Sequence, residues 1–236
     1  MVIDSSTNIG VKREDNQDSY WCSRLKIGDD EVGVLCICDG MGGLEDGALA
    51  SQTVVSMLRD YLLSNNHVLG ISSVLHNANA KILAMSKELS IKQGKKVQMG
   101  TTCTILVCKN GLYNLFHIGD SRCYKVRDDV AELLTEDHNG SQLLKTKGLN
   151  PNEPKYHSYR NKLTRCMGVK EVIELDESSG SYKEGDTFLV CSDGFWHYLD
   201  LGFLLDENII DNLEMSINKC MDAGEKDNIT VGVLKI

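Results

Sequence analysis

The 236-residue sequence predicts an α+β protein built from layered, mainly antiparallel sheets. Strand-like runs fall into two groups on either side of two long helical segments. This order does not alternate strand, helix, strand, as a doubly wound parallel sheet would require. The length suits one sizeable core, and 42% hydrophobic and 25% charged residues are ordinary for a globular protein. We therefore expect a single domain over residues 1–236.

Runs rich in β-branched and aromatic residues are typical of strands, and several follow one another closely enough to form hairpins. These predicted strands are Asp18–Leu25, Val32–Cys38, Thr101–Cys108, Leu112–Gly119, Arg122–Arg127, Thr187–Cys191 and Ile229–Leu234.

Two long central segments, Glu45–Leu63 and Ser72–Lys92, carry apolar residues at helical spacing. A third helix is expected over Glu207–Ala223. The stretch 137–160 has weak periodicity and contains both prolines of the chain. We expect it to be a mostly irregular surface segment, of the kind that often covers an active site.

Charge and composition exclude several functional classes. The formal net charge of −9 argues against a nucleic-acid binder, and against a nuclease or phosphodiesterase that needs a basic surface. No segment approaches the roughly 20 apolar residues of a membrane span, and the polar N-terminus does not read as a signal peptide. Several of the nine cysteines lie in apolar runs, which indicates free thiols in a reducing compartment. A cytoplasmic protein is expected.

Acidic residues stand next to the ends of several predicted strands. Asp39, Asp120 and Asp193 lie just after strands and beside glycine, and Asp227 precedes the last strand. Each alone is usually a turn residue. If the strands pack side by side, the carboxylates converge, and two of them about 4 Å apart repel by roughly 4 kcal/mol at an effective dielectric near 20. Such a group needs protons or cations, and oxygen donors suit Mg²⁺ or Mn²⁺.

A lone arginine lies among acids in the stretch Arg13–Asp18, just before the first predicted strand. The stretch could be a solvated charged turn. Alternatively, Arg13 could offer its guanidinium fork to a pair of phosphate oxygens, with Asp18 joining the acidic group.

Eight short motifs occur in a fixed order along the chain. They are RxxNQD at Arg13–Asp18, DGMGG at Asp39–Gly43, GTT at Gly100–Thr102, GDSR at Gly119–Arg122, LTxDH at Leu134–His138, NxLTRxxG at Asn161–Gly168, SDG at Ser192–Gly194 and DNxT at Asp227–Thr230. Each alone is weak, but together they span nearly the whole chain and resemble the protein phosphatase 2C family of metal-dependent protein phosphatases, in its compact bacterial form.

The resemblance implies a four-layer α-β-β-α sandwich, with two mainly antiparallel sheets around a dimetal site. Two Mn²⁺ or Mg²⁺ ions are implied as cofactors, and a third ion in bacterial members. In this scheme Asp39 bridges the first two ions and Gly40 adds its backbone carbonyl to one of them. Asp193 and Asp227 complete the ligands of the other.

The remaining roles are also implied by the resemblance alone. Asp18 would reach a metal through water, and Asp120 with Asp193 would hold the third ion. Arg13 would bind the substrate phosphate, and 137–160 would be the flap segment beside the site.

The implied activity is hydrolysis of phosphoserine and phosphothreonine in proteins, by direct attack of a metal-bridging hydroxide on phosphorus. The expected partners are phosphoprotein substrates and a cognate serine/threonine kinase, and the chain is expected to be a monomer. The alternative is a catalytically silent member that only binds phosphoproteins. Silent members usually lose a core aspartate, whereas Asp18, Asp39, Asp193 and Asp227 are all present here.

Two positions depart from the pattern of many relatives. Met41 stands where some members have a histidine proposed as the general acid, and Gln17 stands where many have glutamate. His157 in the flap could supply the proton, or it could be an exposed loop histidine. Gln17 adds no charge, so one metal is expected to bind more weakly.

Overall fold

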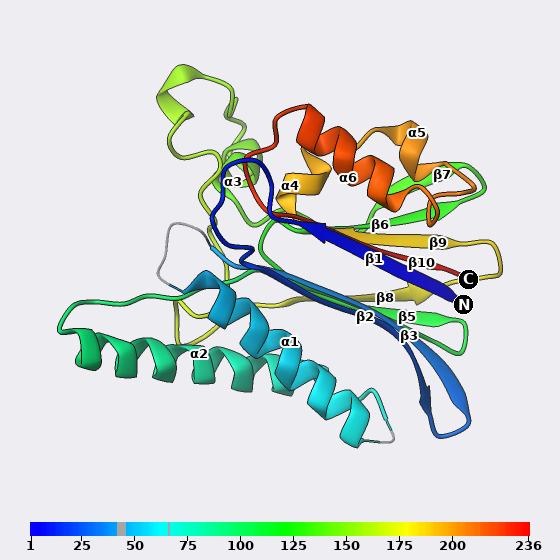
Figure 1. Cartoon of the computed structure of the whole chain (residues 1–236), viewed down its shortest axis with the longest axis horizontal. Helices are drawn as coiled ribbons and strands as arrows, with labels where there is room; N and C mark the ends of the chain where they lie inside the picture. The colour runs from blue at the N-terminus through cyan, green and yellow to red at the C-terminus, as the bar shows by residue number, and fades with distance from the viewer. Residues whose placement is uncertain (42–45, 66) are drawn as a thin grey trace.

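Two five-stranded sheets face each other, and helices cover their outer faces (Figure 1). This is a computed structural model of the chain, and it describes residues 1–41, 46–65 and 67–236. Every pairing between neighbouring strands is antiparallel. The architecture is therefore the α-β-β-α sandwich of antiparallel sheets that the sequence predicts.

The strands divide between the sheets without regard to their order in the chain. The first sheet runs β1 (Val2–Asn8), β10 (Ile229–Lys235), β9 (Thr187–Cys191), β6 (Arg122–Arg127) and β7 (Val130–Leu133). The second runs β2 (Asp18–Ile27), β3 (Asp30–Asp39), β4 (Cys103–Lys109), β5 (Leu112–Ile118) and β8 (Asp176–Ser181).

Helices protect each sheet from solvent on its outer face. The long helices α1 (Gly47–Ser64) and α2 (Ile71–Gln93) lie over the second sheet (Figure 1). The shorter helices α4 (Asp193–Trp196), α5 (Leu201–Leu204) and α6 (Leu213–Asp222) lie over the first. Among the described helices, none is long and apolar enough to cross a membrane.

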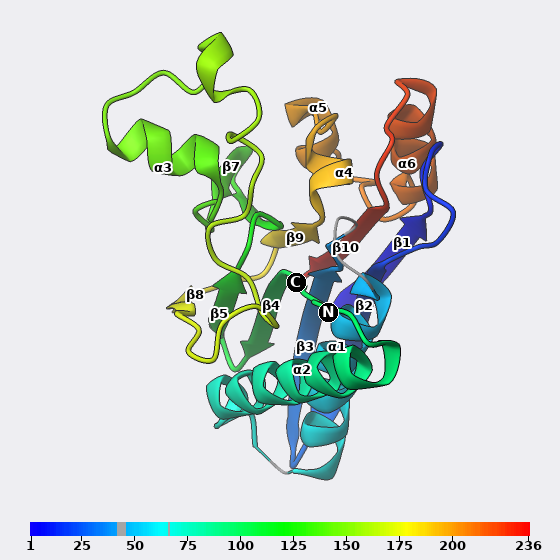
Figure 2. The same cartoon turned by 90° about the vertical axis from the view of Figure 1, so that its left-hand side faces the viewer.

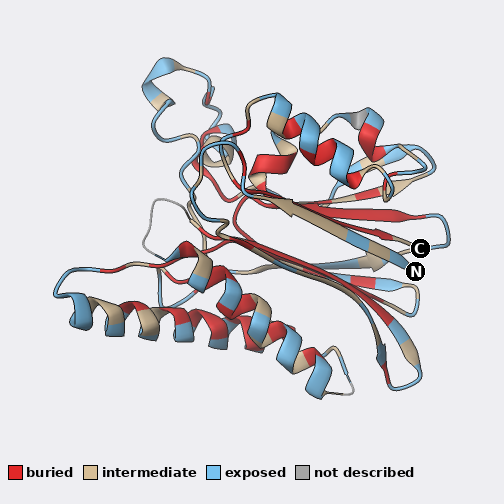
Figure 3. Cartoon of the chain, in the orientation of Figure 1, coloured by how far each residue is buried: buried red, intermediate tan, exposed pale blue. Residues whose placement is uncertain are grey.

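Strand β3 shows why some strand sequences are continuously apolar. Leu35 and Ile37 are fully buried against the opposite sheet, and Cys36 and Cys38 are fully buried in the core cluster beneath α1 and α2. A strand covered on both faces keeps apolar residues at every position instead of alternating with polar ones. The burial pattern in Figure 3 shows the same effect, with the inner strands buried along most of their length.

The structure corrects several predicted boundaries. The third helix begins at Leu213, six residues after Glu207, because Asp206 accepts hydrogen bonds from the Asn208 N–H and the Asn212 side chain and holds the intervening chain in turns. Strands β1, β7 and β8 were not predicted. Glu45, the predicted start of the first helix, lies outside the described residues.

The segment 137–160 is less irregular than predicted. It contains helix α3 (Gly140–Thr146) and the short 3₁₀ helix η1 (Pro154–Tyr156). Asn139 caps α3, because its side-chain oxygen accepts a hydrogen bond from the Gln142 N–H at 3.1 Å. The helix and the chain after it stand out beyond the sheets at one end of the sandwich (Figures 1 and 2).

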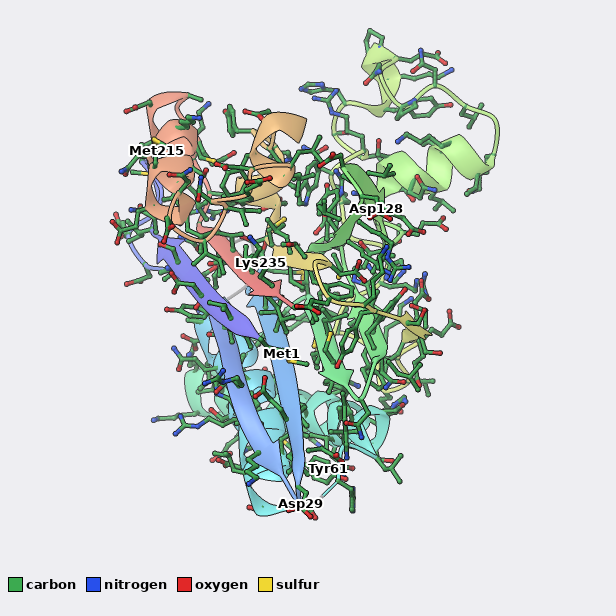
Figure 4. All side chains as sticks on the ribbon, turned by 90° about the vertical axis from the view of Figure 1, so that its right-hand side faces the viewer. Met1, Asp29, Tyr61, Asp128, Met215 and Lys235 are labelled. Atoms are coloured by element: carbon green, nitrogen blue, oxygen red, sulfur yellow. The ribbon has the colours of Figure 1, made fainter. Side chains whose placement is uncertain are left out.

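The two ends of the sandwich differ in what they carry. At one end lie the termini, with Met1 near Lys235, and the β2–β3 turn at Asp29 (Figure 4). At the other end β3 finishes at Asp39, opposite Asp18 of β2. Figure 2 looks onto this second end, where α3 also lies. The acidic strand ends are therefore gathered on the side of the predicted flap.

Candidate active site

A cavity of about 560 Å³ opens at the end of the sandwich where β3 finishes. Five residues singled out in the sequence line it, namely Arg13, Asp39, Asp120, Asp193 and Asp227. Met41 lines it too. The remaining walls include Gln98, Thr102, Asn161 and Lys162.

Strand pairing brings the acids of distant segments to this cavity. The β2–β3 register places Asp18 directly opposite Asp39. On the other sheet, the Ser192 N–H donates to the Thr230 carbonyl at 3.0 Å, which holds the end of β9 against the start of β10. Asp193 follows the end of β9 and Asp227 precedes the start of β10, so both side chains reach the same cavity.

Two glycines permit backbone approaches that no other residue would allow. A Cβ on Gly194 would lie 2.2 Å from the Asn228 carbonyl oxygen, and one on Gly40 would lie 2.4 Å from the carbonyl oxygen of Gly47. Gly40 therefore packs the end of β3 directly against the start of α1. Its predicted role as a carbonyl ligand stays a prediction, and Gly42 and Gly43 of the same motif lie outside the described residues.

Asp18 lies beneath the cavity and is only 9% exposed. Its pKa is raised to about 7, mainly by burial and also by the nearby carboxylates of Asp193 and Asp227, although hydrogen bonds from Thr230 and Ser192 act to lower it. Both hydroxyls donate to Oδ2, at 2.6 and 2.9 Å. The other oxygen, Oδ1, is buried without a hydrogen-bond partner.

Asp39 and Asp193 are half-buried and lie in direct contact. Burial raises the pKa of both side chains; Asp18 and Asp193 add to the rise at Asp39, and Asp227 adds to the rise at Asp193. Two carboxylates this close to each other are stable only when one is protonated or when a cation is bound. Asp193 Oδ1 is a second buried oxygen with no partner. Burial likewise raises the pKa of Asp120 to about 8, with Asp193 and Asp137 adding to the effect.

These features fit divalent cations. Unpartnered carboxylate oxygens in a half-buried site are costly unless they are protonated or bound to a cation, and hard oxygen donors suit Mg²⁺ or Mn²⁺. Within the part of the chain that the structure describes, no three acidic, histidine or cysteine side chains already form a cation cage. The donors are thus present but spread around the cavity, and cations would have to draw them together.

Arg13 reaches the cavity but faces an acid there. Its Nε and Nη2 donate to the two oxygens of Asp227 at 2.9 and 2.6 Å, and both side chains are about one-third exposed. This bidentate pair raises the pKa of Arg13. The guanidinium has five N–H donors, so the Nη1 group remains available to a further anion. Its predicted phosphate contact stays a prediction.

Asp120 is fixed in place through its backbone. The Trp196 indole N–H donates to the Asp120 carbonyl at 2.8 Å, and the Arg122 guanidinium stacks over the Trp196 ring at 3.5 Å. Arg122 in turn pairs with Asp137, the first residue of the predicted flap, at 2.8 Å. His157, considered above as a proton donor, is exposed and does not line the cavity.

Sequence reasoning concentrated on the aspartates and missed the polar residues that hold them. Thr102 accepts the Asp39 N–H at 2.9 Å. Asn228 accepts the Gln17 N–H at 2.9 Å and donates to the Asp15 carbonyl at 3.1 Å, so it holds the loop that carries Arg13. Like Ser192 and Thr230, these residues lie in the GTT, SDG and DNxT motifs. Membership in these motifs was the only sequence feature that could have indicated their roles.

Comparison with known proteins gives matches over almost the full chain. The profile of the protein phosphatase 2C family matches residues 11–223. The "Serine/threonine phosphatase stp" of Listeria innocua is 27% identical over 240 residues, which cover 98% of this chain and 94% of that protein. The serine/threonine phosphatase of S. agalactiae superimposes with a TM-score of 0.85 at 28% identity, over 100% of this chain and 99% of that one.

A second solved structure shares the fold. It is the catalytic domain of the serine/threonine protein phosphatase PstP in complex with two manganese ions, with a TM-score of 0.79 at 24% identity, over 98% of this chain and 96% of that one. The length of the profile match and the agreement of the solved structures lead to one conclusion. The chain belongs to the protein phosphatase 2C family of metal-dependent protein serine/threonine phosphatases.

Proposed function

We propose that this cavity hydrolyses phosphoserine and phosphothreonine in protein substrates, within one catalytic domain over residues 1–236 that uses 137–160 as a flap. The observation that carries the proposal is the pair of buried, unpartnered oxygens of Asp18 and Asp193 beside the Asp39–Asp193 contact. They are the donors expected where cations complete a site. The two manganese ions in the PstP domain support the same cofactor.

The proposed ligand set follows the sequence prediction. Asp39 would serve both of two Mn²⁺ or Mg²⁺ ions, with the Gly40 carbonyl, Asp193 and Asp227 as further donors. Asp18 would act through water, and Asp120 with Asp193 would hold a third ion.

When bound, such ions lower the pKa of a coordinated water and neutralise charge on the phosphate. The chain's own residues do the positioning. The free Nη1 group of Arg13 would donate to a phosphate oxygen and help offset the charge that develops there. Lys162 lines the cavity and forms no ion pair with another described residue, so its ammonium adds a positive charge for the incoming phosphate. Met41 offers no proton, so the proton for the leaving alkoxide must come from elsewhere.

The biological setting is also proposed. A phosphatase of this class acts on phosphoproteins made by a cognate serine/threonine kinase. All nine cysteines are unpaired in the structure, which suits a cytoplasmic location. We propose that the chain acts as a monomer, as the sequence predicts.

The purified protein with Mn²⁺ should release phosphate from para-nitrophenyl phosphate and from a phosphothreonine peptide, and EDTA should abolish both reactions. Asp39→Asn and Asp193→Asn should each lower kcat/KM by roughly 100-fold or more, because each removes charge that the cations require. Asp60→Asn, a change to an exposed acid on α1, is the matched control and should leave activity intact. Full activity in Asp39→Asn or Asp193→Asn would rule out the proposed metal site.

The alternative of a silent phosphoprotein-binding member has a distinct outcome in the same experiment. A wild-type protein that binds the phosphothreonine peptide but never releases phosphate, at any Mn²⁺ or Mg²⁺ concentration, would favour that alternative.

A further inference from the structure

A second cavity, of about 270 Å³, lies beside the active-site cavity. The two cavities share Leu163, Cys166 and Val169 as lining residues. The two cavities therefore share a wall, and a peptide with one residue in the first can place a nearby residue in the second.

The second cavity is suited to an apolar group. Its buried residues include Ile118, 1% exposed, and Ile173, 6% exposed, and Val172 at its edge is 78% exposed. Arg165 also lines it, but the Arg165 guanidinium is paired with Asp176 at 2.7 Å and needs no further anion. Five of the ten lining residues are aliphatic, and Lys170 and Glu174 are the charged ones besides Arg165. The aliphatic part of the lining offers burial of an apolar side chain.

The wall of this cavity is held rigidly. Met167 and Thr101 exchange two backbone hydrogen bonds, at 2.9 and 3.2 Å. The Asn79 side chain accepts the Gly168 N–H at 2.7 Å and donates to the Lys170 carbonyl at 2.9 Å. A preformed wall of this kind lowers the entropy cost of binding, because little of it must be ordered by the ligand.

The size of the cavity indicates what could occupy it. A volume of about 270 Å³ falls just below the roughly 300–1,000 Å³ of small-molecule sites. It is large enough for one aliphatic or aromatic side chain. Peptide-binding proteins commonly combine one charged anchor with an adjacent pocket for an apolar residue.

We propose that the second cavity binds an apolar side chain of the phosphoprotein substrate, a few residues from the phosphorylated one, and so gives the enzyme a sequence preference. This inference rests on the proposed function, because the phosphoresidue must occupy the neighbouring cavity. An extended peptide advances about 3.3–3.6 Å per residue, so a short segment spans the shared wall.

The test uses phosphothreonine peptides in which a single leucine is moved through each position of an otherwise alanine-rich sequence. In the wild-type protein, leucine at one position or two adjacent ones should raise kcat/KM roughly 10-fold over alanine, the factor expected for burying such a side chain. Val172→Glu places a charge at the edge of the cavity and should abolish this gain. It should leave hydrolysis of para-nitrophenyl phosphate and of the all-alanine peptide unchanged.

Val130→Glu is the matched control, since Val130 is 66% exposed and lies on β7, outside both cavities. It should preserve the leucine preference. Equal kcat/KM for leucine at every position, or a preference that survives Val172→Glu, would overturn the inference while leaving the proposed function intact. Failure of the wild-type protein to hydrolyse para-nitrophenyl phosphate would overturn both.

Discussion

Two buried aspartates at different places in the sandwich carry opposite pKa shifts. Asp18, beneath the active site, is 9% exposed, and Asp186, just before β9, is fully buried. Burial raises the pKa of Asp18 to about 7, and its hydrogen-bond donors are the neutral hydroxyls of Ser192 and Thr230. Burial also acts to raise the pKa of Asp186, but hydrogen bonds from Arg127 and the Lys183 N–H outweigh it and lower the pKa.

The comparison separates an acid whose oxygens are all paired with protein cations from acids that keep an oxygen available for a bound cation. Arg127 donates to both oxygens of Asp186, and the Lys125 ammonium lies 3.8 Å away. By contrast, Asp18 and Asp193 each keep a buried oxygen without a partner. A carboxyl group with such a buried, unpartnered oxygen is stable only when it is protonated or when a cation is bound to it. Unsatisfied charge is thus concentrated at the cavity.

The largest predicted effect concerns the satisfied acid. Asp186→Asn should lower the free energy of unfolding by about 3–4 kcal/mol, because it leaves Arg127 and the buried Lys125 without their shared carboxylate. Since this pair lies away from the cavity, the loss should be the same in EDTA and in Mn²⁺. Urea unfolding followed by circular dichroism measures it.

The matched control for that change is Asp128→Asn. Asp128 is 75% exposed and pairs with Lys183 at the surface, so its loss should cost less than about 1 kcal/mol. If Asp186→Asn also lowered the free energy of unfolding by less than about 1 kcal/mol, burial would not make the Asp186 ion pairs more stabilising than the exposed Asp128–Lys183 pair.

The second prediction concerns the unsatisfied acids and pH. Because their folded-state pKa values are raised above the unfolded ones, the folded protein holds more protons between about pH 4 and 8. The free energy of unfolding of the metal-free protein should therefore fall as pH rises through that range, because Asp18 and Asp120 both have raised pKa values in the folded state. Mn²⁺ should restore stability most strongly at the upper end, as thermal unfolding in EDTA and in Mn²⁺ would show.

Asp193→Asn provides the internal comparison for the pH experiment. Replacing one member of the Asp39–Asp193 contact by a neutral amide should flatten the pH dependence of the metal-free protein and weaken the response to Mn²⁺. Acids with lowered pKa values, such as Asp176 and Asp186, lose their contribution only as pH falls below about 4, outside the tested window. A metal-free protein whose stability rises from pH 5 to 8 would contradict the interpretation of the cavity.

The fold was predictable where the chain's own pattern determines its structure. The strands at β3, β4, β9 and β10 carry continuous apolar runs because both of their faces are buried. Strand β8 has the sequence DESSGS, which carries no apolar signal. It forms a strand because it pairs with β5 at the edge of a sheet. Pairing with a strand distant in sequence is not visible in the local residue pattern.

The candidate site was predictable in its residues but not in its geometry. The acids at strand ends and the motif order indicated which side chains gather, and all but Asp18 and Gly40 line the cavity. The Arg13–Asp227 pair was not foreseen, since residues 214 positions apart in the chain give no sequence signal for a contact. The second cavity was equally hidden, because its aliphatic wall reads as ordinary core.

The last and smallest prediction concerns Arg13, which pairs with an acid of the protein and also lines the candidate active site. Arg13 satisfies Asp227 in the metal-free protein, and in the proposed reaction it would serve the phosphate instead. Arg13→Ala should therefore raise KM about 10-fold, equivalent to roughly 1.4 kcal/mol, while lowering kcat less. Steady-state kinetics with a phosphothreonine peptide measure both constants, with Arg59→Ala, an exposed change on α1, as the control. If kcat fell and KM did not change, Arg13 would act in the transition state alone, and a ground-state phosphate contact would be excluded.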